Sequence, residues 1–103
     1  MPITVAFQNI NSKKFEEIVP DAREVVINDF IPFDDPAYPM LQYIDEYSDT
    51  IFNGSQMRGF LLEWDRLMQT LTDPRQREVA LEIRRLAEKC RANPQTYLRF
   101  IGD

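Results

Sequence analysis

Histidine is absent from this chain of 103 residues, and cysteine occurs once, at Cys90. Without an imidazole, the commonest general base near neutral pH is missing, and Ser-His and Cys-His nucleophile systems and most zinc sites are excluded. One cysteine cannot form an intrachain disulfide, which is typical of reducing compartments. Cys90 lies among apolar residues at helical spacing, so we expect a buried, unreactive thiol.

Glycine is scarce as well, with three residues, none of them spaced as in a phosphate-binding loop. Nucleotide binding of those types is therefore excluded. No apolar run reaches the roughly 18 residues of a membrane-spanning helix, and no basic region followed by an apolar stretch opens the chain. We expect a cytoplasmic protein that contacts no membrane.

Apolar residues make up 44% of the chain and aromatic residues 12%, enough for one globular core, so we predict a single domain over residues 1–103. The net charge of −5 is unevenly distributed. Residues 1–54 hold ten acids against three bases, a net charge of −7, whereas residues 55–103 hold nine bases and seven acids. The front half should repel nucleic acid and attract a basic partner.

The front half gives short structural signals. Alternating apolar residues predict a strand over 3–7. Phe15, Ile18 and Val19 follow Ser12 at helical spacing and predict a short helix within 9–20. A β-branched run at 25–27 predicts a strand over 23–29. Three prolines make 30–39 an irregular loop. Residues 40–44 fit a strand or a helical turn, and we favour the strand, followed by a turn over 45–49.

The second half carries two helical patterns. Asn53 and Gln56 form a capping box before an apolar stripe at helical spacing. Asp73 and Pro74 start a second helix, which Asn93-Pro94 ends. The link between the helices is short, so we expect an antiparallel hairpin, and residues 96–101 predict a last strand. The predicted fold class is α+β: a small, mostly antiparallel sheet packed against an antiparallel two-helix hairpin.

Two charged clusters have chemical interpretations. Arg77, Arg84 and Arg91 form a stripe that could contact phosphates, but acids lie among them, so we expect an ion-paired face and no nucleic-acid partner. Asp34-Asp35 and Asp45-Glu46 could bind a hard cation or act as an acid–base pair. Acids in turns more often cap backbone amides. We therefore expect no cofactor, metal or catalytic residue.

Aromatic residues surround these acids in the proline-rich loop. Rigid aromatic anchors carry much of the energy of protein interfaces, although rings that only fill the core would explain the pattern equally well. Under the first interpretation, the predicted partner-binding residues are Phe33, Asp34, Asp35, Tyr38, Tyr43, Asp45, Glu46 and Tyr47.

Two stretches resemble segments of small uncharacterised bacterial proteins: Asp49–Asn53 leading into Gln56-Met57, and Tyr97–Asp103. The resemblance extends over roughly residues 38–103. It implies a bacterial cytoplasmic origin and a helix start at Asn53, and it implies no activity or ligand.

Two hypotheses follow. The favoured one is a non-enzymatic protein-binding module of a bacterial cell, such as an acidic immunity protein or antitoxin-like inhibitor, because an acidic surface speeds the capture of a basic protein. The alternative is a small-ligand or divalent-metal-binding domain that uses Asp34, Asp35, Asp45 or Asp49. The sequence leaves the oligomeric state open.

Overall fold

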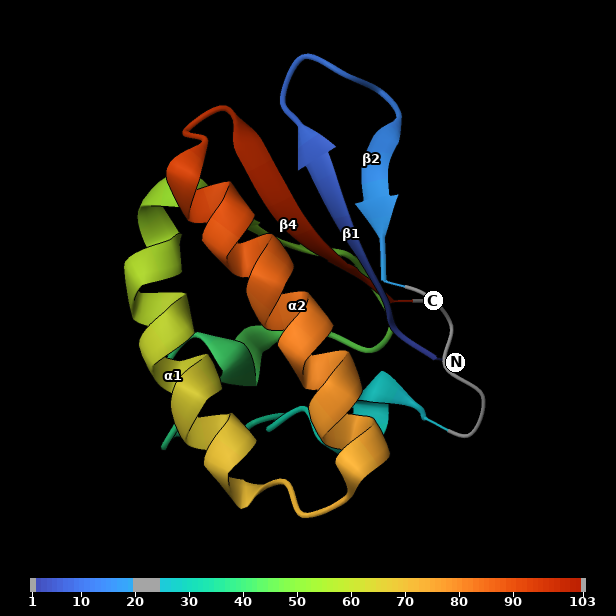
Figure 1. Ribbon diagram of the computed structural model, residues 1–103, viewed down its shortest axis with the longest axis vertical. Helices are drawn as coiled ribbons and strands as arrows, with labels where there is room; N and C mark the ends of the chain where they lie inside the picture. Colours follow the sequence, from blue (N-terminus) through green and yellow to red (C-terminus); the bar gives the residue numbers. More distant parts are fainter. Residues whose placement is uncertain (1, 20–24, 103) are drawn as a thin grey trace.

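A computed structural model describes residues 2–19 and 25–102 and contains four strands, two α-helices and three 3-10 helices. In chain order the elements are β1 (Thr4–Asn9), β2 (Phe15–Ile18), η1 (Ile27–Asp29), η2 (Leu41–Tyr43), β3 (Thr50–Asn53), η3 (Gly54–Gln56), α1 (Met57–Thr70), α2 (Pro74–Ala92) and β4 (Thr96–Ile101). The strands form one sheet in the order β2-β1-β4-β3, and every neighbouring pair is antiparallel. Both helices lie over one face of this sheet (Figure 1). The predicted fold class is confirmed.

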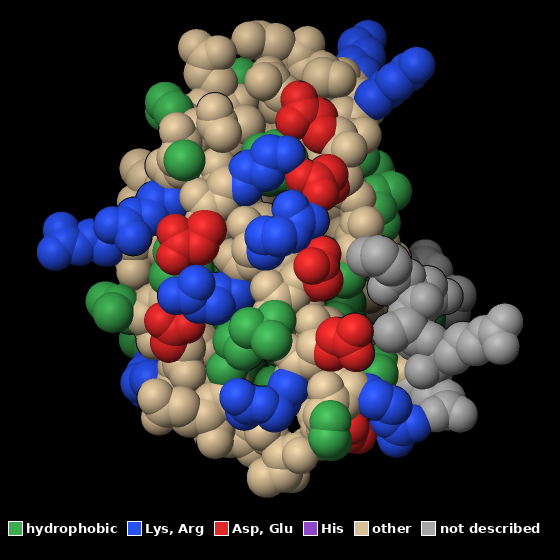
Figure 2. All heavy atoms as spheres, in the orientation of Figure 1, with side chains coloured by type: hydrophobic (Ala, Val, Ile, Leu, Met, Phe, Trp, Pro, Cys, Tyr) green, Lys and Arg blue, Asp and Glu red, His purple; other side chains and the backbone are tan. Residues whose placement is uncertain are grey.

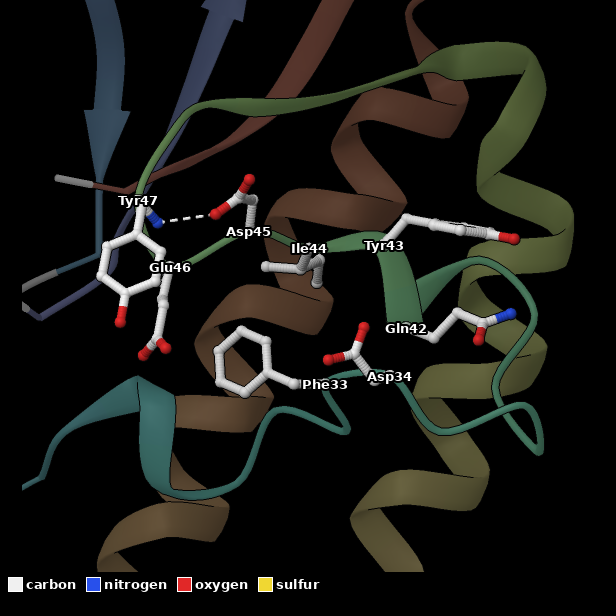
Figure 3. A pocket seen from close by; sticks show the side chains of 8 residues that line it. All are labelled: Phe33, Asp34, Gln42, Tyr43, Ile44, Asp45, Glu46 and Tyr47. Carbon is white, nitrogen blue, oxygen red and sulfur yellow. Dashed lines mark hydrogen bonds between the residues drawn. The ribbon is translucent and has the colours of Figure 1, made fainter.

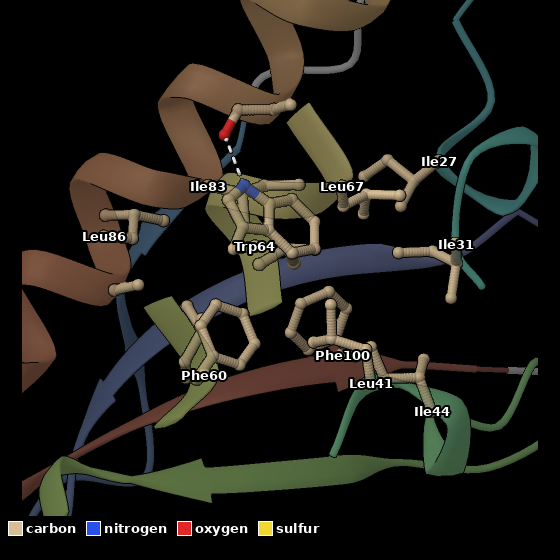
Figure 4. Packing of buried hydrophobic residues seen from close by; sticks show 14 of the residues in the cluster. Ile27, Ile31, Leu41, Ile44, Phe60, Trp64, Leu67, Ile83, Leu86 and Phe100 are labelled. Atoms are coloured by element: carbon tan, nitrogen blue, oxygen red, sulfur yellow. Dashed lines mark hydrogen bonds between the residues drawn. The ribbon is translucent and has the colours of Figure 1, made fainter. Parts of the chain in front are cut away.

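The core lies between the sheet and the helical hairpin, and Trp64 of α1 stands at its centre (Figure 4). Its ring stacks on Phe60 at 5.4 Å between centroids, and Phe100 of β4 lies 6.2 Å away. The indole Nε1 donates to the Ala80 carbonyl of α2 at 2.9 Å, so the one polar atom of the ring is satisfied inside the core. The hydrogen bond also ties α2 to α1.

The predicted helix signals are confirmed at both N-termini. Asn53 Oδ1 accepts from the Gln56 amide at 3.0 Å, and Gln56 Oε1 accepts from the Asn53 amide at 2.8 Å. This capping box opens η3, which leads into α1. Asp73 Oδ1 accepts from the Arg75 amide at 2.8 Å, and Pro74 is the first residue of α2. The apolar residues at helical spacing that predict this helix are all buried: Met57, Phe60, Leu61, Trp64, Leu67, Met68 and Leu71.

The helix predicted within residues 9–20 is wrong, because this segment turns back and forms β2 against β1. Ser12 does not cap a helix. Its hydroxyl accepts from the Lys14 amide at 3.1 Å and closes the turn between the strands. Pairing with β2 gives hydrogen-bond partners to the backbone groups along one edge of β1. The three apolar residues at helical spacing are too weak a helix signal to outweigh this pairing. Pro20 lies outside the described residues.

The strand predicted over 23–29 is also wrong in its described part, where Val25 and Val26 are irregular and Ile27–Asp29 form η1. Both sides of β1 are already taken by β2 and β4, and this segment is absent from the sheet. Ile27 is buried and Val25 packs against the core, so the β-branched run supplies packing. Arg23 and Glu24 lie outside the described residues.

The segment 40–44 is a helical turn rather than the favoured strand: Leu41–Tyr43 form η2, with Leu41 and Ile44 buried three residues apart. Strand β3 was not predicted. Its four residues follow the 45–49 turn and pair with β4, with Phe52 facing the core and Ile51 exposed on the opposite face. The irregular loop over 30–39 contains no strand or helix, as predicted.

Candidate functional site

The proline-rich loop and the turn before β3 line an open pocket of about 420 Å³ (Figure 3). One wall comes from the segment after η1, and the other comes from η2 and the residues that follow it. We call this the tyrosine pocket, and its lining residues are Phe33, Asp34, Gln42, Tyr43, Ile44, Asp45, Glu46 and Tyr47. Six of the eight predicted partner-binding residues therefore lie together.

Two of the predicted residues do not line the pocket. Tyr38 packs against the core from outside and lies under the Arg66 guanidinium, 4.8 Å from the ring centroid. Asp35 Oδ1 accepts from the Ala37 amide at 2.9 Å, which is the turn-capping role expected of such an acid. Of the loop aromatics, Phe30 is buried against Trp64 and fills the core.

Two lining residues were missed from sequence. Ile44 is 3% exposed and forms the apolar base of the pocket, and Gln42 contributes a side-chain amide. The apolar spacing of Leu41 and Ile44 was a signal for a helical turn, which would have placed Ile44 inward. Gln42 gave no signal, because a lone amide in a loop has no pattern.

Helix α1 holds the far side of the loop through two charged side chains. Glu63, itself 7% exposed, accepts from the Met40 and Leu41 amides at 2.9 and 3.0 Å through Oε1. These bonds cap the N-terminus of η2 with a carboxylate. Arg66 Nη2 donates to the Ala37 carbonyl at 2.6 Å. The proline-rich loop is thus fastened to a rigid helix.

The 45–48 turn is fixed by its own acid and by the end of β4. Asp45 accepts from the Tyr47 amide at 2.8 Å and from the Ser48 hydroxyl at 3.0 Å, and these bonds hold the pKa of Asp45 below its usual range. The Gly102 amide donates to the Ser48 carbonyl at 3.1 Å. The adjacent Glu46 carboxylate raises the pKa of the Tyr47 hydroxyl. The turn therefore places a carboxylate acceptor beside that phenol.

Asp34 stands on the opposite wall in an unusual backbone conformation. Its φ of 55° lies in the left-handed region, which aspartate adopts more readily than most residues. Its amide donates to the Gln42 carbonyl at 3.2 Å, a bond that joins the two walls of the pocket. The Asp34 carboxylate is exposed toward the pocket (Figure 3).

The two tyrosines are unusually exposed for their size: Tyr43 is 73% exposed and Tyr47 72%. The charge is one-sided, since Asp34, Asp45 and Glu46 line the pocket and no lysine or arginine of the described residues does. Across residues 2–19 and 25–102, none of these three carboxylates is in an ion pair, whereas Glu17, Asp49, Asp65, Asp73, Glu82 and Glu88 all are.

The basic face of α2 is largely neutralised by such pairs, and blue and red side chains alternate over it (Figure 2). Glu17 of β2 binds Arg85 at 2.7 Å and Lys89 at 2.6 Å. Arg84 binds Asp65 and Glu88 at 2.7 and 3.3 Å. Arg77 donates to the Met68 and Leu71 carbonyls and so caps the C-terminus of α1. Two of the three stripe arginines thus have structural contacts.

The described residues give little support for a metal site, a reactive cysteine or a membrane-spanning helix. In the part of the chain that the structure describes, no group of three potential metal ligands comes together. Cys90 is completely buried, burial raises the pKa of its thiol, and its Sγ contacts the Thr96 carbonyl at 3.5 Å. No described helix combines the length and apolarity needed to cross a bilayer.

No protein-family model, no curated protein and no solved structure matches the chain. The resemblance to bacterial proteins stays a prediction.

Proposed function

We propose that this protein is a non-enzymatic module that binds a basic protein through the tyrosine pocket. The observation that carries the proposal is the combination of two tyrosines that are nearly three-quarters exposed with three carboxylates that have no cationic partner among the described residues. A bacterial immunity protein or antitoxin-like inhibitor, whose target is a basic nuclease or RNA-binding toxin, is the class of module that we propose.

The charge pattern supports a basic partner. Six carboxylates elsewhere on the described surface lie within 4 Å of an arginine or lysine, as Glu17 does beside Arg85 and Lys89. The carboxylates of the pocket lack that compensation, so they leave a local negative potential that attracts a positive surface. Such complementarity raises association rates and makes them sensitive to salt.

The exposed aromatics support a protein rather than a free ion as the ligand. Tyrosine combines a large rigid apolar area with a polar hydroxyl, and it is enriched among the residues that dominate interface energies. Tyr43 and Tyr47 flank the pocket from one continuous segment. A partner that covers both rings removes apolar area from water and reaches the carboxylates at the same time.

The backbone around the pocket is held by hydrogen bonds, so binding should require little loss of conformational entropy. Glu63 and Arg66 fix one wall to α1, the Asp34 amide bonds the other wall, and Gly102 fixes the turn. Each of these contacts is made before any partner arrives. Preorganised sites lose less conformational entropy on binding than mobile loops do.

The test is capture from the protein's own cell lysate by tagged wild type, at low and high salt, with mass spectrometry of what is retained. Wild type should retain a basic protein at low salt and release it at high salt. Glu46→Gln and Asp34→Asn should retain less, whereas Glu78→Gln, which removes an equal charge at an exposed position on α2, should behave as wild type. Equal retention by all four proteins would refute the role of the pocket.

A small ligand is the second candidate, because about 420 Å³ lies in the range of ordinary ligand pockets. The apolar base at Ile44 and the amide of Gln42 would suit a small cationic molecule. A divalent metal is less well supported, since the described residues bring no three metal ligands together. Thermal-shift screening of small amines against wild type and Glu46→Gln tests this candidate, because a ligand that binds only the folded state raises its melting temperature.

A further inference from the structure

The pocket groups that remain available to a ligand limit which type of partner side chain can bind in the tyrosine pocket. Asp45 has its carboxylate oxygens bonded to the Tyr47 amide and the Ser48 hydroxyl, so it acts mainly on its own turn. Asp34 and Glu46 are better placed to meet a ligand, because no hydrogen bond joins the Asp34 carboxylate to another side chain among the described residues and Glu46 has only the Tyr47 hydroxyl beside it. They come from opposite walls, and in Figure 3 they lie on either side of the Phe33 ring.

The aromatic rings favour a flat cation over a round one. The Phe33 and Tyr47 rings lie near the Asp34 and Glu46 carboxylates, whereas the Tyr43 ring points away from them (Figure 3). A guanidinium is planar, stacks on aromatic faces and carries five N–H donors, whereas an ammonium is a compact and strongly hydrated point charge. An arginine that stacks on a ring can therefore still donate to acceptors on two walls.

The chain uses the same chemistry elsewhere. Arg66 lies over the Tyr38 ring at 4.8 Å and donates to the Ala37 carbonyl at the same time. In that arrangement the arginine, the ring and the acceptor all belong to this chain. The tyrosine pocket likewise offers aromatic rings beside oxygen acceptors, here carboxylates, and no described arginine lines it.

We propose that the tyrosine pocket binds an arginine side chain of the basic partner, with the guanidinium stacked on the Phe33 or Tyr47 ring and donating to Asp34 and Glu46. This inference rests on the proposed function, because it names the group by which the partner is recognised. The open shape of the pocket leaves room for the residues on either side of that arginine.

Three capped tripeptides test the assignment: acetyl-Gly-Arg-Gly-amide, its lysine counterpart, and its citrulline counterpart, which keeps the planar shape and lacks the charge. Each is titrated into ¹⁵N-labelled full-length protein at low salt and followed by amide chemical shifts. We expect saturable shifts over residues 33–34 and 42–47 with the arginine peptide, at least threefold weaker binding of the lysine peptide, and no saturation with citrulline. Because one side chain supplies the contacts, affinities should be in the millimolar range.

Glu46→Gln and Asp34→Asn should each weaken the arginine peptide at least threefold, and the matched variant Glu78→Gln should not. Equal binding of arginine and lysine peptides, or shifts confined to other surfaces, would overturn the arginine assignment. If the peptides fail while a protein partner is still captured in a Glu46-dependent way, this inference falls and the proposed function stands. If both fail, the proposed function falls with it.

Discussion

Glu63 shows how a single carboxylate can connect the core to the site. It lies on α1 beside the central Trp64, yet it faces the loop and accepts from two consecutive amides. Those amides have no helical partner at the start of η2, so a buried acid is the economical way to satisfy both. The residue does not line the tyrosine pocket, but it fixes the start of η2, which carries Tyr43 and leads to Ile44.

Replacing Glu63 should therefore destabilise the fold, and the loss should be larger when the acceptor is removed than when only its charge is removed. Glu63→Gln should lower the free energy of unfolding by about 1 kcal/mol, because two charge-assisted hydrogen bonds become neutral ones. Glu63→Leu should lower it by about 3 kcal/mol, because the two amides lose their acceptor. Urea unfolding of both variants measures this, with Glu78→Gln as the surface control. A loss below about 0.5 kcal/mol for Glu63→Leu would show that the loop does not depend on this contact.

The acidic and aromatic residues of the site could be chosen from sequence because loop position, proline content and residue type coincide over 33–47. Six of the eight predicted residues line the pocket on that basis. Asp35 and Tyr38 could not be separated from them, since only the hydrogen bond to Ala37 and the contact with Arg66 exclude them. Glu63 was missed because an acid on an amphipathic helix is ordinarily solvated.

At the scale of elements, β2 is fastened to α2 by the Glu17 cluster. The Arg85 and Lys89 side chains lower the pKa of Glu17 from 4.5 to about 2. A carboxyl whose pKa is lower in the folded than in the unfolded protein contributes stability above its unfolded pKa and loses that contribution as the pH falls toward the folded pKa. The cluster should therefore weaken between about pH 4.5 and pH 2.

Glu17→Gln tests this ion-pair cluster. At pH 6 it should reduce the free energy of unfolding by about 1 kcal/mol, the upper range for exposed ion pairs. The difference from wild type should shrink as the pH falls below 4.5. Chemical denaturation across pH 6 to 3 measures the trend, with the neighbouring, exposed Glu16→Gln as control. A difference that stays constant with pH would contradict the cluster's role.

The end of β4 and the turn of the pocket are in close contact at Gly102. A Cβ atom there would lie 2.5 Å from the Ser48 carbonyl oxygen and 2.6 Å from that of Asp45. Gly102→Ala should therefore push the turn away and cost about 1–3 kcal/mol, as overpacking does. Amide chemical shifts should change mainly over residues 45–48. If shifts and stability match those of wild type, this contact does not hold the turn.

The elements that sequence predicts well are those with two agreeing local signals. Helices α1 and α2 have caps as well as apolar stripes, and β4 follows a clear helix stop. The elements predicted wrongly are decided by distant partners. β2 forms because β1 needs a neighbour, and η2 forms because Glu63, over twenty residues later, caps it. Local spacing contains no information about either partner.

Charged side chains are arranged differently on two surfaces of the molecule. The face formed by α2 and β2 neutralises itself in ion pairs, whereas the tyrosine pocket leaves its carboxylates unpaired among the described residues. A net charge of −5 adds a general attraction for basic proteins. We therefore propose that ion pairs stabilise one surface of the fold and that the tyrosine pocket, on another, binds the partner.

The most direct measurement of the central claim is the affinity of the captured partner, once purified, for wild type and for the double variant Asp34→Asn/Glu46→Gln at two salt concentrations. We expect the double variant to bind about tenfold more weakly at low salt and to lose most of the salt dependence, while Glu78→Gln matches wild type. Equal affinity and equal salt dependence for wild type and the double variant would contradict the account, because the partner would then bind elsewhere.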